Sequence, residues 1–309
     1  MSKTSEKSCQ EKNVKRIFNE MAGEYDHLLD LWYNYTFGNI DDVLKGEFRL
    51  NPSYGKKPIA IDVGCGTGIQ SLRLASLGYR VVGIDIADVL VQMAKSKLVT
   101  AGYQDAEFSI ADAQSLPFED NIASCVNCCG PTLSFVPDWP KALSEIARCL
   151  QPNGKVLLEV EGKWNLDLFW EIVNALGHDF LGYDEKLSTA LSHLLPPWNV
   201  GHTMNYSFKL ETDESVIMPL KLFAPSELNK ELRKVGLVED KKWGLHVLTN
   251  LVPSTVLHRS NPSALLRFAF TALASVEKHV YASFPFNSLG NSILIVAHKM
   301  SSSGEERSE

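Results

Sequence analysis

Short apolar runs alternate with helical patterns along the middle of the chain. The runs occupy residues 58–63, 80–86, 106–113, 122–129 and 155–161. Apolar positions follow helical spacing over 69–78, and 140–150 gives a second helix that ends at a proline–glycine turn. Strands separated by helices are typical of a parallel sheet, because parallel neighbours need a crossover connection. The pattern therefore predicts an α/β fold.

The same patterns continue on both sides of this core. Apolar and aromatic residues at helical spacing predict one or two helices within 13–48, before the first strand. Residues 162–223 form a long insertion, predicted as a cap of two helices and a β-hairpin with alternating arms. After the insertion we expect a helix at 225–235, a strand at 243–252, a helix at 263–284 and a last strand at 291–299. The polar ends, 1–12 and 301–309, are expected to be disordered, which leaves 13–300 as one domain with its cap.

The first strand ends in an acid and a glycine-rich turn. Asp62 is followed by Gly64, Gly66 and Gly68, which let the backbone lie close to a ligand. The dinucleotide fingerprint places its third glycine where this chain has Ile69, and a carboxylate would repel a pyrophosphate. The turn thus disfavours a dehydrogenase and favours a cationic, amino-acid-bearing ligand.

Residues 58–68, PIAIDVGCGTG, resemble motif I of the class I S-adenosyl-L-methionine methyltransferases, and the resemblance extends to residue 161. It implies a Rossmann-like sheet of seven strands, mostly parallel, whose last strand runs antiparallel between the fifth and the sixth. It also implies S-adenosyl-L-methionine as cofactor, with Asp85 at the ribose hydroxyls and Asp112 at the adenine amino group. The alternative is a Rossmann-like domain that binds another adenosine ligand or has lost its cofactor. The cofactor-binding residues that we predict are Tyr25, Asp62, Gly64, Cys65, Gly66, Gly68, Asp85, Ile86, Asp112, Ala113, Asn127 and Cys128.

The string FNEMAGEYDHLLDLWY, residues 18–33, resembles the amino-terminal helix of the ubiquinone and menaquinone C-methyltransferases and their small-molecule relatives. In that family a Tyr–Asp pair lies over the cofactor, and Tyr25 and Asp26 match the pair. The alternative is an amphipathic helix whose Tyr25 only fills the core.

The net charge of −7 and the pI near 5.7 argue against a nucleic-acid surface, which needs clustered Lys and Arg. No run of residues approaches the roughly 20 apolar residues of a membrane span, and the first dozen residues are unlike a signal peptide. We expect a cytoplasmic protein.

Three cysteines crowd the fourth predicted strand. Neighbouring residues of a strand face opposite sides, so Cys125 and Cys128 point apart and stand about 10 Å from each other. A zinc site needs sulfur atoms that converge, so we expect buried apolar cysteines, including Cys129, and no metal.

The acceptor site is predicted to lie among the amino-terminal helices, the cap and residues 243–290. Aromatic residues there favour a small, largely apolar or aromatic organic acceptor: Trp32, Tyr33, Trp164, Phe169, Trp170, Trp198 and Tyr206. The pattern does not single out a general base. The catalytic candidates are Tyr25, Glu161, His178 and His202. Each of the four histidines in these regions, which include His193 and His246, is more typical of a surface or core residue than of a catalyst. A protein or RNA methyltransferase and a non-catalytic partner subunit that binds the cofactor are the alternative functions.

Overall fold

The computed structural model describes residues 3–26, 30–50, 55–183, 186–193, 195–210, 212–259 and 261–301. Its centre is a sheet of seven strands in the order β3-β2-β1-β4-β5-β9-β8. The first five strands along the chain pair in parallel, while β9 runs antiparallel between β5 and β8. The strands are β1 (Ile59–Val63), β2 (Arg80–Asp85), β3 (Glu107–Ile110), β4 (Ala123–Cys128), β5 (Leu150–Glu161), β8 (Leu237–Leu245) and β9 (Ser292–Lys299). This topology confirms the predicted fold class, including the position and direction of the last strand.

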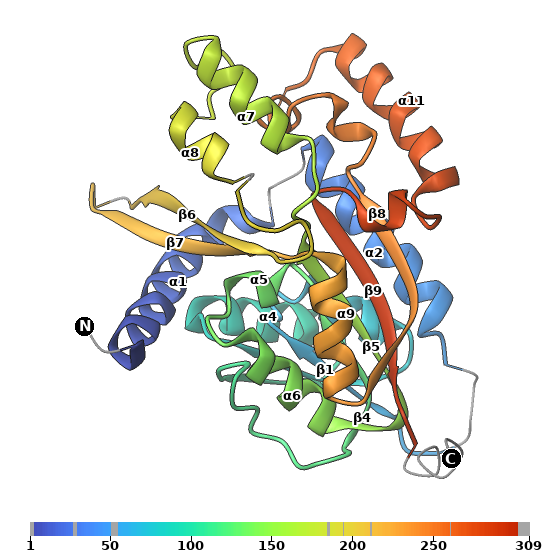
Figure 1. The fold of residues 1–309 in the computed structure, drawn as a ribbon. Helices are drawn as coiled ribbons and strands as arrows, with labels where there is room; N and C mark the ends of the chain where they lie inside the picture. Colours follow the sequence, from blue (N-terminus) through green and yellow to red (C-terminus); the bar gives the residue numbers. More distant parts are fainter. Residues whose placement is uncertain are drawn as a thin grey trace, which may run out of the picture.

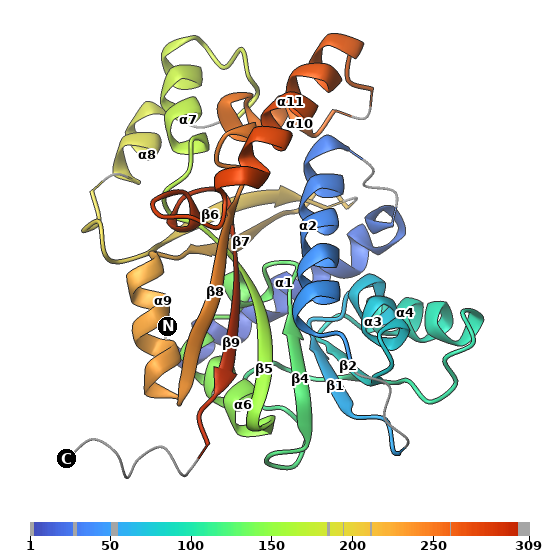
Figure 2. The same ribbon diagram turned by 90° about the vertical axis from the view of Figure 1, so that its right-hand side faces the viewer.

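Helices cover both faces of the sheet, as Figures 1 and 2 show. Helices α6 (Trp139–Cys149) and α9 (Pro225–Lys234) pack on one face. The opposite face is covered by α2 (Leu31–Glu47) and α3 (Ile69–Ser76), and α4 (Asp88–Thr100) lies against β2 and β3. Helix α11 (Ala264–Val280) packs against α2 beyond the ends of the strands (Figures 1 and 2). The shorter helices are α5 (Thr132–Phe135), η1 (Thr249–Leu251), α10 (Ser254–Leu257) and η2 (Phe286–Ser288).

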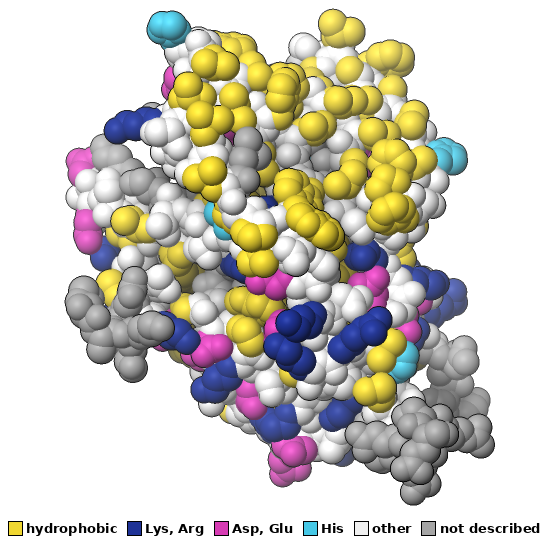
Figure 3. Space-filling view, viewed as in Figure 1, with side chains coloured by type: hydrophobic (Ala, Val, Ile, Leu, Met, Phe, Trp, Pro, Cys, Tyr) yellow, Lys and Arg dark blue, Asp and Glu magenta, His cyan; other side chains and the backbone are white. Residues whose placement is uncertain are grey.

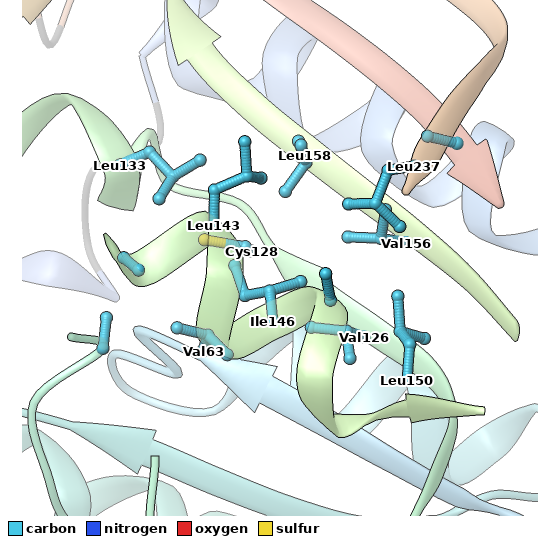
Figure 4. Close-up of a cluster of buried hydrophobic side chains, with 14 of the residues drawn as sticks. Val63, Val126, Cys128, Leu133, Leu143, Ile146, Leu150, Val156, Leu158 and Leu237 are labelled. Atoms are coloured by element: carbon cyan, nitrogen blue, oxygen red, sulfur yellow. The ribbon is translucent and has the colours of Figure 1, made fainter. Parts of the chain in front are cut away.

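The alternation of side chains along β4 separates its cysteines, as the sequence predicts. Cys128 packs among Leu143, Ile146 and Leu158, between the sheet and α6 (Figure 4). Cys125 and Cys129 belong to the apolar cluster on the other face. All three thiols are buried, and burial raises the pKa of each above its ordinary value.

The insertion leaves the sheet and returns to it at one point. The backbone N–H of Phe223 donates to the carbonyl of Glu161 at 2.8 Å, and the N–H of Lys163 donates to the carbonyl of Phe223 at 2.9 Å. Between these residues lie α7 (Asp167–Leu176), α8 (Leu187–Ser192) and the hairpin of β6 (His202–Lys209) and β7 (Ser215–Leu222). The hairpin packs against α1 (Lys3–Tyr25) through Ile17, Leu210 and Val216.

The largest differences from the predicted boundaries lie in α1 and β8, while β5 begins at Leu150 rather than 155 and α11 ends at Val280 rather than 284. Residues 3–12, expected to be disordered, belong to α1, because Lys7 pairs with Asp138 at 2.8 Å and Gln114 donates to Glu11 at 2.9 Å. The strand expected at 243–252 instead spans Leu237–Leu245, and a buried carboxylate of Glu277 receives the N–H groups of the turn that follows it. The expected disorder of 302–309 lies outside the described residues. Within the described ranges, no helix is both long and apolar enough to cross a bilayer.

Candidate cofactor and acceptor site

A cavity opens at the carboxyl ends of β1, β2 and β4, where open α/β sheets place their ligands. It is lined by Glu11, Val14, Phe18, Tyr25, Phe37, Gly64, Cys65, Gly66, Thr67, Ile69, Gln70, Ile84, Asp85, Ile86, Leu90, Ala111, Asp112, Ala113, Gln114, Cys129, Gly130, Thr132, Phe135, Val136 and Pro137. Of the twelve predicted cofactor residues, this set contains Tyr25, Gly64, Cys65, Gly66, Asp85, Ile86, Asp112 and Ala113.

The glycine turn forms the floor of the cavity. The N–H groups of Gly64 and Cys65 both donate to the carbonyl of Ile84, at 2.8 and 2.9 Å, which holds the turn against β2. Gly64 has a φ of +71°, and a Cβ at this position would lie 2.2 Å from the hydroxyl of Thr132. Gly66 also has a positive φ, +51°, but no atom lies within 4 Å of its Cβ position. Gly64 thus makes room for Thr132, while the missing side chain of Gly66 leaves backbone as the cavity surface, which a closely held ligand needs.

Asp85 joins this turn to the end of β2. One oxygen of its carboxylate accepts from the N–H of Gly66 and the other from the N–H of Ala87, both at 2.9 Å. Burial raises the pKa of Asp85, and the hydrogen bonds from the backbone oppose that rise. Each carboxylate oxygen has a further acceptor site, so the group can hold two hydroxyls without losing its backbone bonds.

Asp62 is not part of the cavity surface, although the sequence predicts a cofactor contact there. It is 1% exposed and accepts from Ser71 at 2.5 Å and from the side chain of Asn127 at 2.8 Å. Burial raises the pKa of Asp62 to about 6. The acid therefore connects β1, α3 and β4 behind the turn and supports the shape of the site.

Gly68, Asn127 and Cys128 also lie outside the lining. Gly68 precedes α3 at a φ of +86°, and a Cβ there would lie 2.9 Å from the Cα of Ala94. Its role in this structure is the close packing of α3 on α4. The residue after the predicted Cys128, Cys129, faces the cavity instead.

Asp112 lies on the rim with Gln114. The side-chain amide of Gln114 donates to both carboxylate oxygens of Asp112, at 3.1 and 2.9 Å, and to Glu11 of α1 at 2.9 Å. The third strand and α1 are thus joined across the cavity. The sequence pattern around 112–114 predicts the acid but not this contact with α1.

Helix α1 closes one side of the cavity. Glu11, Val14, Phe18 and Tyr25 recur at intervals of three, four and seven residues, and all of them line it. Burial raises the pKa of Tyr25, so its hydroxyl stays protonated at neutral pH. The residue after it, Asp26, accepts from the hydroxyl of Thr67 at 2.5 Å and pairs with Lys97 of α4 at 2.8 Å. The two residues of the predicted Tyr–Asp pair therefore have different roles. Tyr25 faces the cavity, and Asp26 binds the end of the helix to the glycine turn.

The other catalytic candidates lie in three different places. Glu161 ends β5, and burial, followed by repulsion from Glu159 and Asp167, raises its pKa to about 8. His178 is exposed beyond the end of α7. His202 lies within the cap, its ring 4.9 Å from that of His193, and burial lowers its pKa to about 4. Neither histidine lines the cavity.

His246 is buried within a structural network. Its ring stacks on Trp32 with centroids 3.6 Å apart, and its nitrogens bond the hydroxyls of Thr36 and Thr249 at 2.8 and 3.0 Å. Burial holds its pKa well below the ordinary value, so it stays neutral.

Of the aromatic residues predicted to surround the acceptor, none whose side chain the structure describes lines this cavity. Trp170 donates to the carbonyl of Asn250, while Phe169 and Trp198 are largely exposed. Trp32, Tyr33 and Trp164 pack elsewhere, and the side chain of Tyr206 lies outside the described part of the structure. The aromatic lining comes instead from Phe18, Phe37 and Phe135, and only the helical spacing of Phe18 relative to Tyr25 signals it in the sequence.

Comparison with known proteins agrees with this geometry. Residues 61–158 match the family described as a methyltransferase domain. The chain is 32% identical over 158 residues to the demethylmenaquinone methyltransferase of Lactococcus lactis, covering 48% of this chain and 58% of that protein. It is 30% identical over 151 residues to the enzyme of the same name from Anoxybacillus flavithermus, covering 48% and 61%. The matched region thus spans about three-fifths of these relatives.

Among solved structures, the [4+2]-cyclase SpnF is similar over 93% of this chain and 96% of its own, with a TM-score of 0.54 and 16% identity. This likeness concerns the fold, because the same scaffold can carry different reactions.

Proposed function

We propose that the protein transfers a methyl group from S-adenosyl-L-methionine to a small, largely apolar organic acceptor, since residues 61–158 match the family described as a methyltransferase domain. The observation that carries the proposal is the hydrogen bond from the N–H of Gly66 to the carboxylate of Asp85. It places backbone without a side chain next to a carboxylate on the cavity surface. Bound there, the cofactor supplies a methyl group already activated by its positive sulfur. The chain then has to hold the donor, orient the acceptor and exclude water.

Donor binding is assigned to the turn and the two strand-end acids. Asp85 accepts the ribose hydroxyls through the oxygen sites that its backbone bonds leave open, and Asp112 accepts from the adenine amino group. Ile86 and Ala113 supply apolar contacts to the base. The fixed position of the turn, held by Ile84, limits how far the bound donor can shift.

Acceptor binding is assigned to the apolar part of the same cavity. Phe18, Phe37, Phe135 and Val136 present no charge there, so a phosphate-rich acceptor would lose its hydration without compensation. Tyr25 is the polar group among them and is protonated, which suits a hydrogen bond to an acceptor oxygen or nitrogen. The methyltransferases named above act on a demethylmenaquinone by their names, and an aromatic acceptor of that general kind fits this lining.

The experiment measures binding and transfer separately. Titration calorimetry should show S-adenosyl-L-methionine and its demethylated product binding, while NAD gives no heat. Methyl-labelled cofactor, added to fractionated cell extracts, should label the small-molecule fraction. Binding of NAD alone would refute the cofactor assignment, and label in protein or RNA would favour a macromolecular acceptor. Binding without any transfer would favour a non-catalytic partner subunit.

A further inference from the structure

Exposed apolar side chains gather at the end of the molecule formed by α7, α8, η1, α11 and two adjacent loops (Figures 1 and 3). We call this set the apolar end. It consists of Phe169, Leu176, Phe180, Leu191, Leu195, Trp198, Leu251, Leu265, Phe268, Val276 and Phe284. Phe284, Leu195 and Leu265 are 84%, 82% and 77% exposed. Scattered apolar residues are normal on a protein surface, but a gathering of this size marks an interaction site.

Helix α11 shows that these residues are not an incomplete core. Its inner face packs on α2, where the ring of Phe270 meets that of Tyr35 with centroids 5.8 Å apart, and Leu266 and Ala274 are partly buried in the same cluster. Leu265 and Phe268 lie on the outer face and are mostly exposed, so the helix is apolar on both sides. A helix that only covered its neighbours in this chain would carry polar residues on the outer side.

A groove with a cationic wall borders the apolar end. Trp198, Phe284 and Leu289 line one part of it, and Lys230, Arg233, Lys234 and Lys242 line another. Glu231 pairs with Lys234 at 2.6 Å and Glu239 with Lys242 at 3.3 Å, so the excess positive charge comes from Lys230 and Arg233. Figure 3 shows dark blue Lys and Arg side chains over α9, directly below the yellow apolar region.

We propose that the apolar end docks on an anionic phospholipid bilayer, with Trp198 and Phe284 inserted at the interface and Lys230 and Arg233 at the lipid phosphates. The charge complementarity of the groove favours this partner. A second copy of the chain fits less well, because a two-fold contact through the groove would set the cationic walls against each other. Docking of this kind would bring the protein to apolar acceptors dissolved in lipid. It can be measured without methyl transfer, so its test is separate from the test of the proposed function.

Vesicle sedimentation with the full chain tests the proposal. Phosphatidylcholine vesicles that contain phosphatidylglycerol should bind the protein, and vesicles of phosphatidylcholine alone should bind it more weakly. The pair Trp198→Ser and Phe284→Ser should weaken binding to both kinds of vesicle by at least about tenfold, because two large apolar side chains no longer insert. The pair Lys230→Glu and Arg233→Glu should remove the preference for anionic vesicles.

Matched controls lie on α4, on the opposite side of the molecule from α9 (Figure 2). Val99→Ser removes an exposed apolar residue and Lys95→Glu reverses an exposed charge, and neither should change vesicle binding. The proposal fails if the wild type does not bind anionic vesicles. It also fails if soluble glycerol phosphate binds and vesicles do not, or if sedimentation equilibrium shows a dimer that Trp198→Ser and Phe284→Ser dissociate.

Discussion

The hydroxyl of Thr67 donates to the carboxylate of Asp26 at 2.5 Å, which joins the glycine turn to the end of α1 across 41 positions of the sequence. Lys97 of α4 pairs with the same carboxylate at 2.8 Å. The contact fixes α1 beside the cavity and places Tyr25, the preceding residue, in its lining. The covering helix and the cofactor turn are therefore expected to act together.

Replacing Asp26 with Ala should weaken binding of S-adenosyl-L-methionine by about tenfold, or about 1.4 kcal/mol, because α1 loses a charged anchor at the turn. Calorimetry measures the affinity, and chemical denaturation shows whether the fold is retained. Asp105→Ala is the control, since it removes an exposed ion pair with Lys57 away from the cavity. Equal affinities for the wild type and Asp26→Ala would show that α1 does not cover the cofactor.

Alanine at Gly64 and at Gly66 should have different effects. Gly64→Ala combines a φ of +71° with a Cβ 2.2 Å from Thr132, so it should lower the free energy of unfolding by about 1–3 kcal/mol. Gly66→Ala also has the strain of a positive φ, +51°, but its methyl group lies where no atom is within 4 Å, so it should destabilise the fold less than Gly64→Ala and should weaken cofactor binding. Urea denaturation and calorimetry on both variants separate the two effects. Unchanged affinity in a folded Gly66→Ala variant would place the cofactor away from the turn.

The stability of the protein should fall as the pH rises from about 4.5 to about 8 through the titration of Glu161. Its pKa in the folded state is raised to about 8 from 4.5, so between these values the folded state holds a proton that the unfolded state has lost. One such proton gives a slope of at most about −1.4 kcal/mol per pH unit, and partial exposure to solvent reduces it. Glu161→Gln should flatten this slope and raise stability at pH 8. Denaturation across this pH range tests it, with the exposed Glu119→Gln as control, and equal slopes in wild type and Glu161→Gln would contradict it.

Native protein should react with a thiol reagent at one of its six cysteines. Cys9 is exposed, whereas Cys65, Cys125, Cys128, Cys129 and Cys149 are buried. Burial raises the pKa of each of these five thiols and so suppresses the reactive thiolate. Ellman's reagent should therefore count one thiol per chain before unfolding and six after it. Rapid reaction of several native thiols, or zinc found in stoichiometric amount by elemental analysis, would contradict the assignment of the strand cysteines as packing residues.

The sequence pattern is enough to predict the central strands and the glycine turn, because both depend on residues close together in the chain. A run that ends in Asp62 and alternating glycines specifies a strand and a tight turn within ten residues. The spacing from there to Asp85 fits one helical crossover, which gives the parallel pairing of β1 and β2. Local periodicity also separated Cys125 from Cys128, since strand neighbours alternate faces.

Which side chains meet at the cavity follows from the packing of segments that are distant in the chain. Asp62 lies one residue before the end of β1 and Asp85 ends β2, yet the packing of Ser71 and Asn127 buries the first, while the second faces the cavity. The helical form of residues 3–12 depends on partners such as Asp138, more than a hundred positions away. Local sequence patterns do not predict such contacts, because the contacts form only when the helical crossover connections bring distant segments to one edge of the sheet. The same reason explains why the aromatic lining comes from Phe37 and Phe135 rather than from the tryptophans of the cap.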